Sequence, residues 1–251
     1  MDSVTTLLYI AIFAFGITVG SFLNVCILRL PKGESIVTVP SHCTGCGKRL
    51  RWFELIPLFS YLFLRGRCSV CKSRISAQYP LIEAANGVLW ITLFWRFGPT
   101  PEFLPACFLC SALIVLSVID ARTREIPPGT TIFILVLGLV RVLFDLNNWP
   151  LYVIGFFAVS LPLYLILILT RGRGIGGGDI KLMAVCGLFL GWKLVVLAFF
   201  AGCCIGSVVH LSLMAAKKAG HSLALGPYLS AGVFLALMWG DTALNWYFGL
   251  F

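Results

Sequence analysis

Long apolar runs make up most of this chain and constrain its fold more than any other feature. A helix needs roughly 20 apolar residues to cross a bilayer, and eight runs approach or exceed that length. They cover residues 5–29, 81–97, 103–120, 131–146, 150–170, 181–192, 194–214 and 223–246. Only 12% of the 251 residues are charged, about half the share typical of soluble domains. We therefore predict an all-α polytopic membrane protein with about eight transmembrane helices. Because the run at 181–192 is short, seven spans remain an alternative.

The distribution of Lys and Arg predicts how these spans are oriented, since short cytoplasmic loops accumulate positive charge. With eight spans and an N-terminus outside the cytosol, 16 of the 19 basic residues fall on the cytosolic side. The exceptions are Arg96, Arg141 and Lys193. The net charge of +9 is therefore interpreted as a topology signal and not as a sign of nucleic-acid binding.

A polar insert at residues 31–80 interrupts the apolar runs and falls on the cytosolic side. It contains "CTGC" (Cys43, Cys46) and "CSVC" (Cys68, Cys71), with 21 residues between the pairs. This spacing is typical of four-cysteine zinc sites, in which a tight turn presents both sulfurs of a pair to one metal. Disulfides are the alternative, but a reducing cytosol disfavours them. Four thiolates leave no open position on zinc, so we predict a structural site.

Two aspartates end up on the same membrane face in this topology. Asp120 ends the apolar run "ALIVLSVID", and Asp179 lies in "RGRGIGGGDIKL", just before another apolar run. Either one alone is explained as an interfacial cap or as an ion-pair partner of Arg122 or Lys181. Together in a low-dielectric site, they would share a proton, so that one can activate water while the other protonates a leaving amine. This is the equipment of peptide hydrolysis, and we predict Asp120 and Asp179 as the catalytic residues.

The glycines before Asp179 suggest how a substrate gains access. Gly176, Gly177 and Gly178 allow close backbone approach and backbone conformations that other residues avoid. We predict that they form an active-site loop at the membrane edge.

The chain resembles type IV prepilin peptidases, which are bifunctional leader peptidases and N-methyltransferases in the GxGD class of membrane aspartyl proteases. Gly176 to Asp179 matches the GxGD motif and continues as "GDIKL", and "SVIDARTREIP" is similar to the segment that bears the first catalytic aspartate. The other matching segments, in order, are "GSFLNVCILRLP", the two cysteine pairs, "ELIPLFSYL", "QYPLIEA" and "GPYL". Pro128 departs from the pattern, because many relatives have an acid there.

The resemblance implies an enzyme of the bacterial inner membrane. It would cut the basic leader from prepilins or pseudopilins at the cytosolic face, and then methylate the new N-terminal amine with S-adenosylmethionine. The implied organisation is a first transmembrane helix at 1–30, the insert at 31–80 associated with methyltransferase activity, and a peptidase bundle at 81–251. The sequence does not locate the methyl-donor site or assign acid and base roles within the pair.

Substrate recognition is predicted from the acids that can meet a basic leader. Glu54 and Glu83 flank apolar stretches on the cytosolic side and are the candidates for substrate contact. Two other classes of protein remain alternatives: a membrane transporter, which would bury paired acids near mid-membrane, and a zinc-bearing membrane scaffold.

Overall fold

A computed structural model describes residues 3–172, 174–216 and 224–250, and within them every regular element is a helix. The all-α prediction is thereby confirmed. The chain divides into two compact units, Met1–Pro99 and Thr100–Phe251. Of the basic residues used to predict the orientation, Arg173, Lys217 and Lys218 lie outside the described residues.

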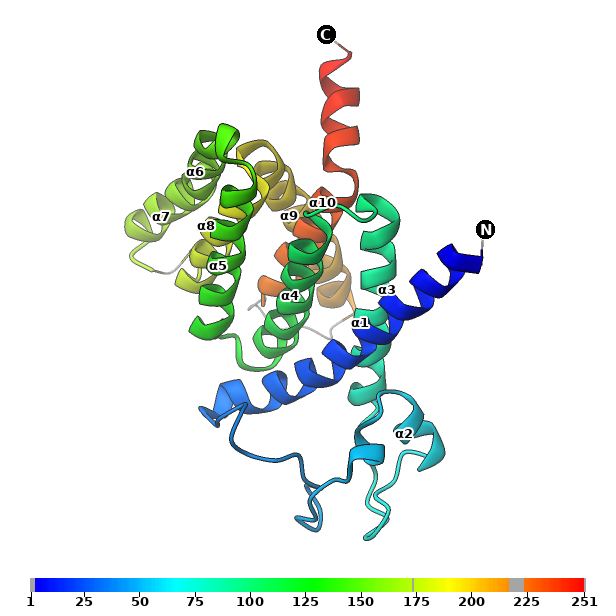
Figure 1. Ribbon diagram of the computed structural model, residues 1–251. Coiled ribbons are helices and arrows are strands. Elements are labelled where there is room, and N and C mark those ends of the chain that lie inside the picture. Colours follow the sequence, from blue (N-terminus) through cyan, green and yellow to red (C-terminus); the bar gives the residue numbers. More distant parts are fainter. Residues whose placement is uncertain (1–2, 173, 217–223, 251) are drawn as a thin grey trace. The chain divides into compact units, whose positions relative to one another are not determined.

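The first unit is built on two long helices that cross each other, α1 (Ser3–Arg29) and α3 (Gln78–Phe97) (Figure 1). Glycines bring their backbones close together: a Cβ added to Gly16 would lie 2.8 Å from Gly87 Cα, and one added to Gly20 would lie 2.8 Å from Glu83 Cα. Small residues allow this close packing between membrane helices, where dispersion contacts replace the hydrophobic effect. Asn86 adds a polar link by donating to the carbonyl of Gly16 at 2.7 Å.

The insert between α1 and α3 contains only short elements. They are η1 (Leu30–Lys32), η2 (Trp52–Leu55) and α2 (Phe59–Phe63). Two turns carry the cysteine pairs, and each is closed by an isolated antiparallel bridge, His42 to Arg49 and Arg67 to Arg74. Few apolar side chains of the insert are buried, so it has little core of its own, which is consistent with a fold that depends on a metal.

The second unit is a helical bundle with α8 at its centre. In chain order its helices are α4 (Phe103–Thr123), α5 (Pro128–Phe144), η3 (Leu146–Asn148), α6 (Trp149–Ala158), α7 (Ser160–Leu169), α8 (Gly177–Leu190), α9 (Trp192–Ala215) and α10 (Gly226–Phe248). Helix α8 packs against α5, α6, α7 and α9 (Figure 1), and ten of its 14 residues are buried. Gly155 and Gly187 let α6 and α8 touch backbone to backbone.

Among the described residues, four stretches are long and apolar enough to cross a membrane: Ser3–Lys32, Phe103–Thr123, Leu146–Leu169 and Trp192–Ala215. The predicted count of eight spans is not confirmed. The run at 150–170 is divided at Val159 into α6 and α7. The run at 181–192 lies mostly in α8, which at about 21 Å is shorter than the ~30 Å hydrocarbon core. Its apolar side chains are explained by burial inside the bundle.

Candidate active site

Asp120 lies in the last turn of α4 and is 5% exposed. Its Oδ2 accepts a hydrogen bond of 2.9 Å from the backbone N–H of Gly226, the first residue of α10. The N-terminus of a helix carries partial positive charge, so α10 is directed to stabilise negative charge at this carboxyl. A Cβ at position 226 would lie 2.7 Å from Asp120 Oδ2, so a residue larger than glycine would displace this carboxyl.

Asp179 is the third residue of α8, and the predicted glycine loop forms the start of this helix. Gly176 is the N-cap with φ −70°, which any residue can adopt, so the expectation of unusual backbone angles is wrong for this position. The glycines instead provide space. A Cβ at Gly176 would lie 3.0 Å from Asp179 Oδ2, one at Gly178 would lie 3.2 Å from Ile126, and Gly177 has no atom within 4 Å of that position.

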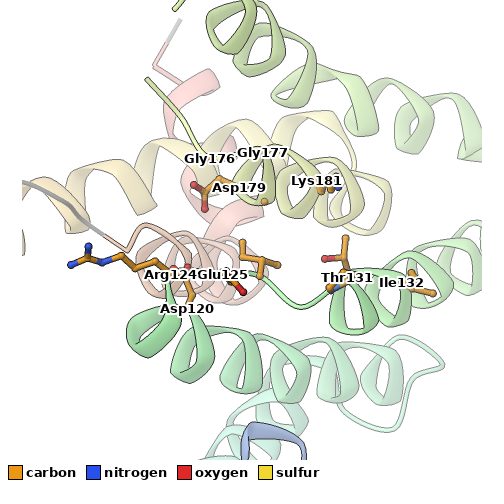
Figure 2. Close-up of a pocket in the computed structure, with 12 residues that line it drawn as sticks. Asp120, Arg124, Glu125, Thr131, Ile132, Gly176, Gly177, Asp179 and Lys181 are labelled. Carbon is orange, nitrogen blue, oxygen red and sulfur yellow. The ribbon is translucent and has the colours of Figure 1, made fainter. Parts of the chain in front are cut away.

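The two aspartates line one cavity of about 680 Å³, into which the glycine loop and the segment after α4 also project. Figure 2 shows Asp120 and Asp179 on opposing helices across this space. Arg124, Glu125 and Lys181 bring further charge to the walls. Two carboxyls beside one cavity titrate as a pair, and a pair that holds one proton has both an acid and a base available. Glu125 also lines this cavity, a position that no motif in the sequence indicates.

The four cysteines of the insert form a cluster whose geometry fits a metal ion. The Sγ atoms of Cys43, Cys46, Cys68 and Cys71 all lie within 4.8 Å of one another, and those of Cys43 and Cys71 are 3.8 Å apart. Tetrahedral zinc with bonds of about 2.3 Å separates its sulfurs by about 3.8 Å. All four cysteines are free thiols. They are the residues that would hold zinc, and a closed four-sulfur site would supply structural stability.

Local hydrogen bonds and neighbouring thiols shift the pKa values of Cys43 and Cys46 in opposite directions. The backbone N–H groups of Cys46 and Gly45, together with the Ser73 hydroxyl, lower the pKa of Cys43 to about 6. The Lys48 N–H favours the Cys46 thiolate, but the neighbouring cysteines outweigh it and raise the pKa of Cys46 to about 11. The cluster therefore resists carrying four negative charges on its own, and a divalent cation would relieve this repulsion.

Each cysteine pair sits in a turn that requires a left-handed residue. Gly47, a residue type that adopts this conformation readily, has φ +70° after the first pair, and Lys72 has φ +58° at the equivalent place after the second pair. A positive φ at lysine is strained. Sequence reasoning missed it, because lysine gives no signal for a left-handed turn.

Glu54, a predicted substrate contact, ties the two cysteine turns together. Its carboxylate accepts hydrogen bonds from Lys48 Nζ at 3.0 Å, from the Arg51 N–H at 2.8 Å and from the Ser69 hydroxyl. Lys48 follows the first cysteine pair and Ser69 lies within the second. The Ser69 hydroxyl, the Arg51 N–H and the Lys48 ammonium together lower the pKa of Glu54 to about 2. With a side chain only 2% exposed, Glu54 is occupied within the insert, and its contact with substrate stays a prediction.

Glu83, the other predicted substrate contact, is 6% exposed on α3. Its Oε2 accepts a 2.8 Å hydrogen bond from the N–H of Leu58, a residue held at φ +61° just before α2. Glu83 thus attaches the insert to the helix pair of the first unit. Its contact with substrate also stays a prediction.

Comparisons with known proteins match both units. The model of the Bacterial Peptidase A24 N-terminal domain matches residues 14–97, and the model of the Type IV leader peptidase family matches residues 107–211. The first match covers the helix pair with the cysteine insert. The second runs from α4 into α9 and includes both aspartates.

Three curated relatives are each named prepilin leader peptidase/N-methyltransferase. The chain is 34% identical to the one from Pseudomonas putida, over 90% of this chain and 88% of that protein. It is 37% identical to the Bacillus subtilis protein, over 94% of this chain and 96% of the relative. It is 32% identical to the Pseudomonas aeruginosa protein, over 92% of this chain and 90% of that relative. No solved structure matches the chain. Family models across both units and full-length relatives above 30% identity establish that this chain belongs to the type IV leader peptidase family.

Proposed function

We propose that the chain is a prepilin leader peptidase and N-methyltransferase of the bacterial inner membrane. The observation that carries this proposal is the cavity lined by Asp120, Asp179 and the glycine loop. Apolar helices of membrane-crossing length and the names of the curated relatives support it. The substrates would be prepilins or pseudopilins that build pili, secretion systems or a DNA-uptake apparatus.

In the proposed peptidase step, the two carboxyls move protons around the bond that is cut. One carboxylate takes a proton from water, whose oxygen then attacks the carbonyl carbon of the last leader residue. The C–N bond breaks as the other carboxyl gives its proton to the departing amine. After cleavage, the aspartate that acted as the base carries the proton and the aspartate that acted as the acid is ionised. Proton exchange with water restores the starting state.

The structure suggests how each part of the site serves this step. The Gly226 N–H holds Asp120 Oδ2, which leaves Oδ1 without a partner among the described residues and available to water or substrate. Gly177 leaves open space beside Asp179, so an extended backbone can pass between the two carboxyls. A site at the ends of α4 and α8 suits a bond located where a pilin helix leaves the cytosolic face of the membrane.

In the proposed transferase step, S-adenosylmethionine would supply a methyl group to the freed amine, which would lose a proton, and S-adenosylhomocysteine would leave as the S–CH₃ bond breaks. The four-cysteine insert supports this activity as a metal-stabilised module next to the membrane. The cluster would hold zinc through Cys43, Cys46, Cys68 and Cys71. Because such a site is closed, the metal would stabilise the insert and take no part in the reaction.

Cleavage of a membrane-embedded prepilin by purified protein tests the proposal. Wild type should release the leader, and Asp120→Asn and Asp179→Asn should not, although each keeps the size of the side chain. Asp145→Asn is the matched control, because Asp145 lies outside the cavity and accepts a hydrogen bond from Tyr152. If the asparagine variants cut as well as wild type, or if wild type does not cut, a transporter or a zinc-bearing scaffold becomes the better interpretation.

The same reaction tests the proposed N-methyltransferase activity. With S-adenosylmethionine present, the product should gain the mass of one CH₂ group at its N-terminal residue. A product that is cut but never methylated would restrict the function to the peptidase.

A further inference from the structure

The insert exposes a series of large apolar side chains that the cysteine cluster does not account for. They lie in one stretch, Trp52–Phe63, which covers η2 and α2 and is called here the apolar segment. Trp52 is 78% exposed, Leu62 69% and Phe63 85%. Four more of its side chains are also exposed: Phe53, Leu55, Ile56 and Phe59. Soluble surfaces rarely carry so many in sequence, and such an exposed group marks an interaction surface.

The hydrogen bond from the Leu58 N–H to the Glu83 carboxylate shows at which level along α1 and α3 the apolar segment is attached. Glu83 packs against Gly20 of α1, nine residues before α1 ends at Arg29. At 1.5 Å per residue, Leu58 is therefore level with a point about 13 Å inside the end of α1. Figure 1 shows α2 close to the N-terminal end of α3. Through Glu83 the segment is thus attached next to Gly20 of α1, which belongs to a stretch of membrane-crossing length.

The outer surfaces of the two helices at this level are themselves apolar. Phe22 on α1 is 48% exposed, and Leu81 on α3 is 65% exposed. Both flank the point where Leu58 is attached. The apolar segment is therefore attached where α1 and α3 also expose apolar side chains.

Positive charge surrounds the apolar segment. Arg51 precedes it, Arg65 and Arg67 follow it, and all three are exposed. Residues 31–80 contain eight Lys and Arg against two Glu, one of which is buried. Basic residues near an anionic leaflet are attracted to its negative surface potential. Aromatic rings and snorkelling arginines are typical of the membrane interface.

We propose that the apolar segment is an interfacial anchor that lies in the headgroup region of an anionic leaflet. Phe59, Leu62 and Phe63 reach the acyl chains, and the flanking arginines bind lipid phosphates. The anchor holds the cysteine cluster against the membrane surface instead of leaving it free in solution. The proposal depends on the membrane location of the chain and not on its peptidase or transferase chemistry.

Photo-crosslinking of the full-length protein in lipid nanodiscs tests this anchor. A benzophenone amino acid replaces Phe63, and the control places it at Val70, which is 61% exposed in the second cysteine turn. In nanodiscs containing phosphatidylglycerol, we expect the Phe63 probe to give a several-fold higher yield of phospholipid adduct than the Val70 probe, as read by intact mass. Equal yields would overturn the proposal. So would crosslinks from the Phe63 probe to residues 100–251 or to a second copy, which would mean that protein covers the segment.

A second comparison tests the role of charge. Replacing Arg51 and Arg67 by Gln should lower the adduct yield in phosphatidylglycerol nanodiscs to the level found in phosphatidylcholine alone. An unchanged yield would contradict the binding of anionic headgroups. A positive crosslink together with absent prepilin cleavage would support the anchor and count against the proposed function, so the two claims fail separately.

Discussion

Replacing Gly226 by alanine should disable cleavage while the helices still form. The new Cβ would lie 2.7 Å from Asp120 Oδ2, which is 0.7 Å short of the 3.4 Å at which ordinary contact begins. It would also lie 3.0 Å from Asp120 Cγ and 3.1 Å from Leu116 Cδ2. Because α4 and α10 are packed along their length, the carboxyl of Asp120 gives way more easily than either helix.

The size of the effect follows from this displacement. A catalytic group misplaced by about 1 Å costs about 100-fold in rate, so we expect kcat/KM to fall about 30- to 100-fold, or about 2–3 kcal/mol of transition-state stabilisation. Steady-state cleavage of a prepilin in detergent or nanodiscs measures it. Circular dichroism and the melting temperature establish that the variant is folded.

Gly129→Ala is the matched control. Gly129 lies in the first turn of α5, outside the residues that line the cavity, and a Cβ there meets no atom within 4 Å. Its kcat/KM should stay within about twofold of wild type. If Gly226→Ala is folded and equally active, the contact between Gly226 and Asp120 does not position the catalytic carboxyl.

Three further predictions concern the insert. Glu54 has a lowered pKa of about 2, so the stability that it contributes is present above its ordinary pKa and is lost as pH falls toward 2. In thermal melts between neutral and acid pH, Glu54→Gln should therefore lose less stability than wild type as the pH falls. An unchanged pH profile would exclude Glu54 as the cause of the loss. Cys68→Ser removes one of four sulfurs, so elemental analysis should find less than one zinc per chain, whereas full occupancy would place the metal elsewhere. Glu83→Ala leaves the Leu58 N–H without its acceptor and should destabilise the insert by about 1–3 kcal/mol. Glu83→Gln keeps an acceptor and should lose less stability, measured as the rate of limited proteolysis within residues 31–80. Equal losses of stability in the two variants would contradict the role of this hydrogen bond.

The elements that sequence could predict are those carried by local patterns. The cysteine pairs form a cluster as their spacing predicts, and the left-handed Gly47 follows from the turn that such a pair needs. Asp120 and Asp179 share a cavity, which the charge distribution anticipated by assigning both to one membrane face. These signals depend on few residues at short range.

Features that depend on packing between distant segments were not predictable. Hydropathy cannot distinguish a helix that faces lipid from one that is buried in protein, so the short α8 was counted as a span. The break at Val159 comes three residues before Pro162, which cannot donate to the carbonyl of Ala158 and so interrupts the helix; hydropathy alone does not register this signal. Gly226 was noticed only as part of a motif, because its hydrogen bond to Asp120 joins residues more than 100 positions apart.

The central claim is that Asp120 and Asp179 act as one catalytic unit. The most direct test compares kcat/KM for prepilin cleavage by Asp120→Asn, Asp179→Asn and the double variant. Residues that act as a unit are strongly non-additive, so we expect all three to share the same residual rate. A double variant slower than either single variant by the product of their separate losses would contradict the claim. A single variant within about tenfold of wild type would also contradict it, because a residue essential to the pair costs far more than that when removed.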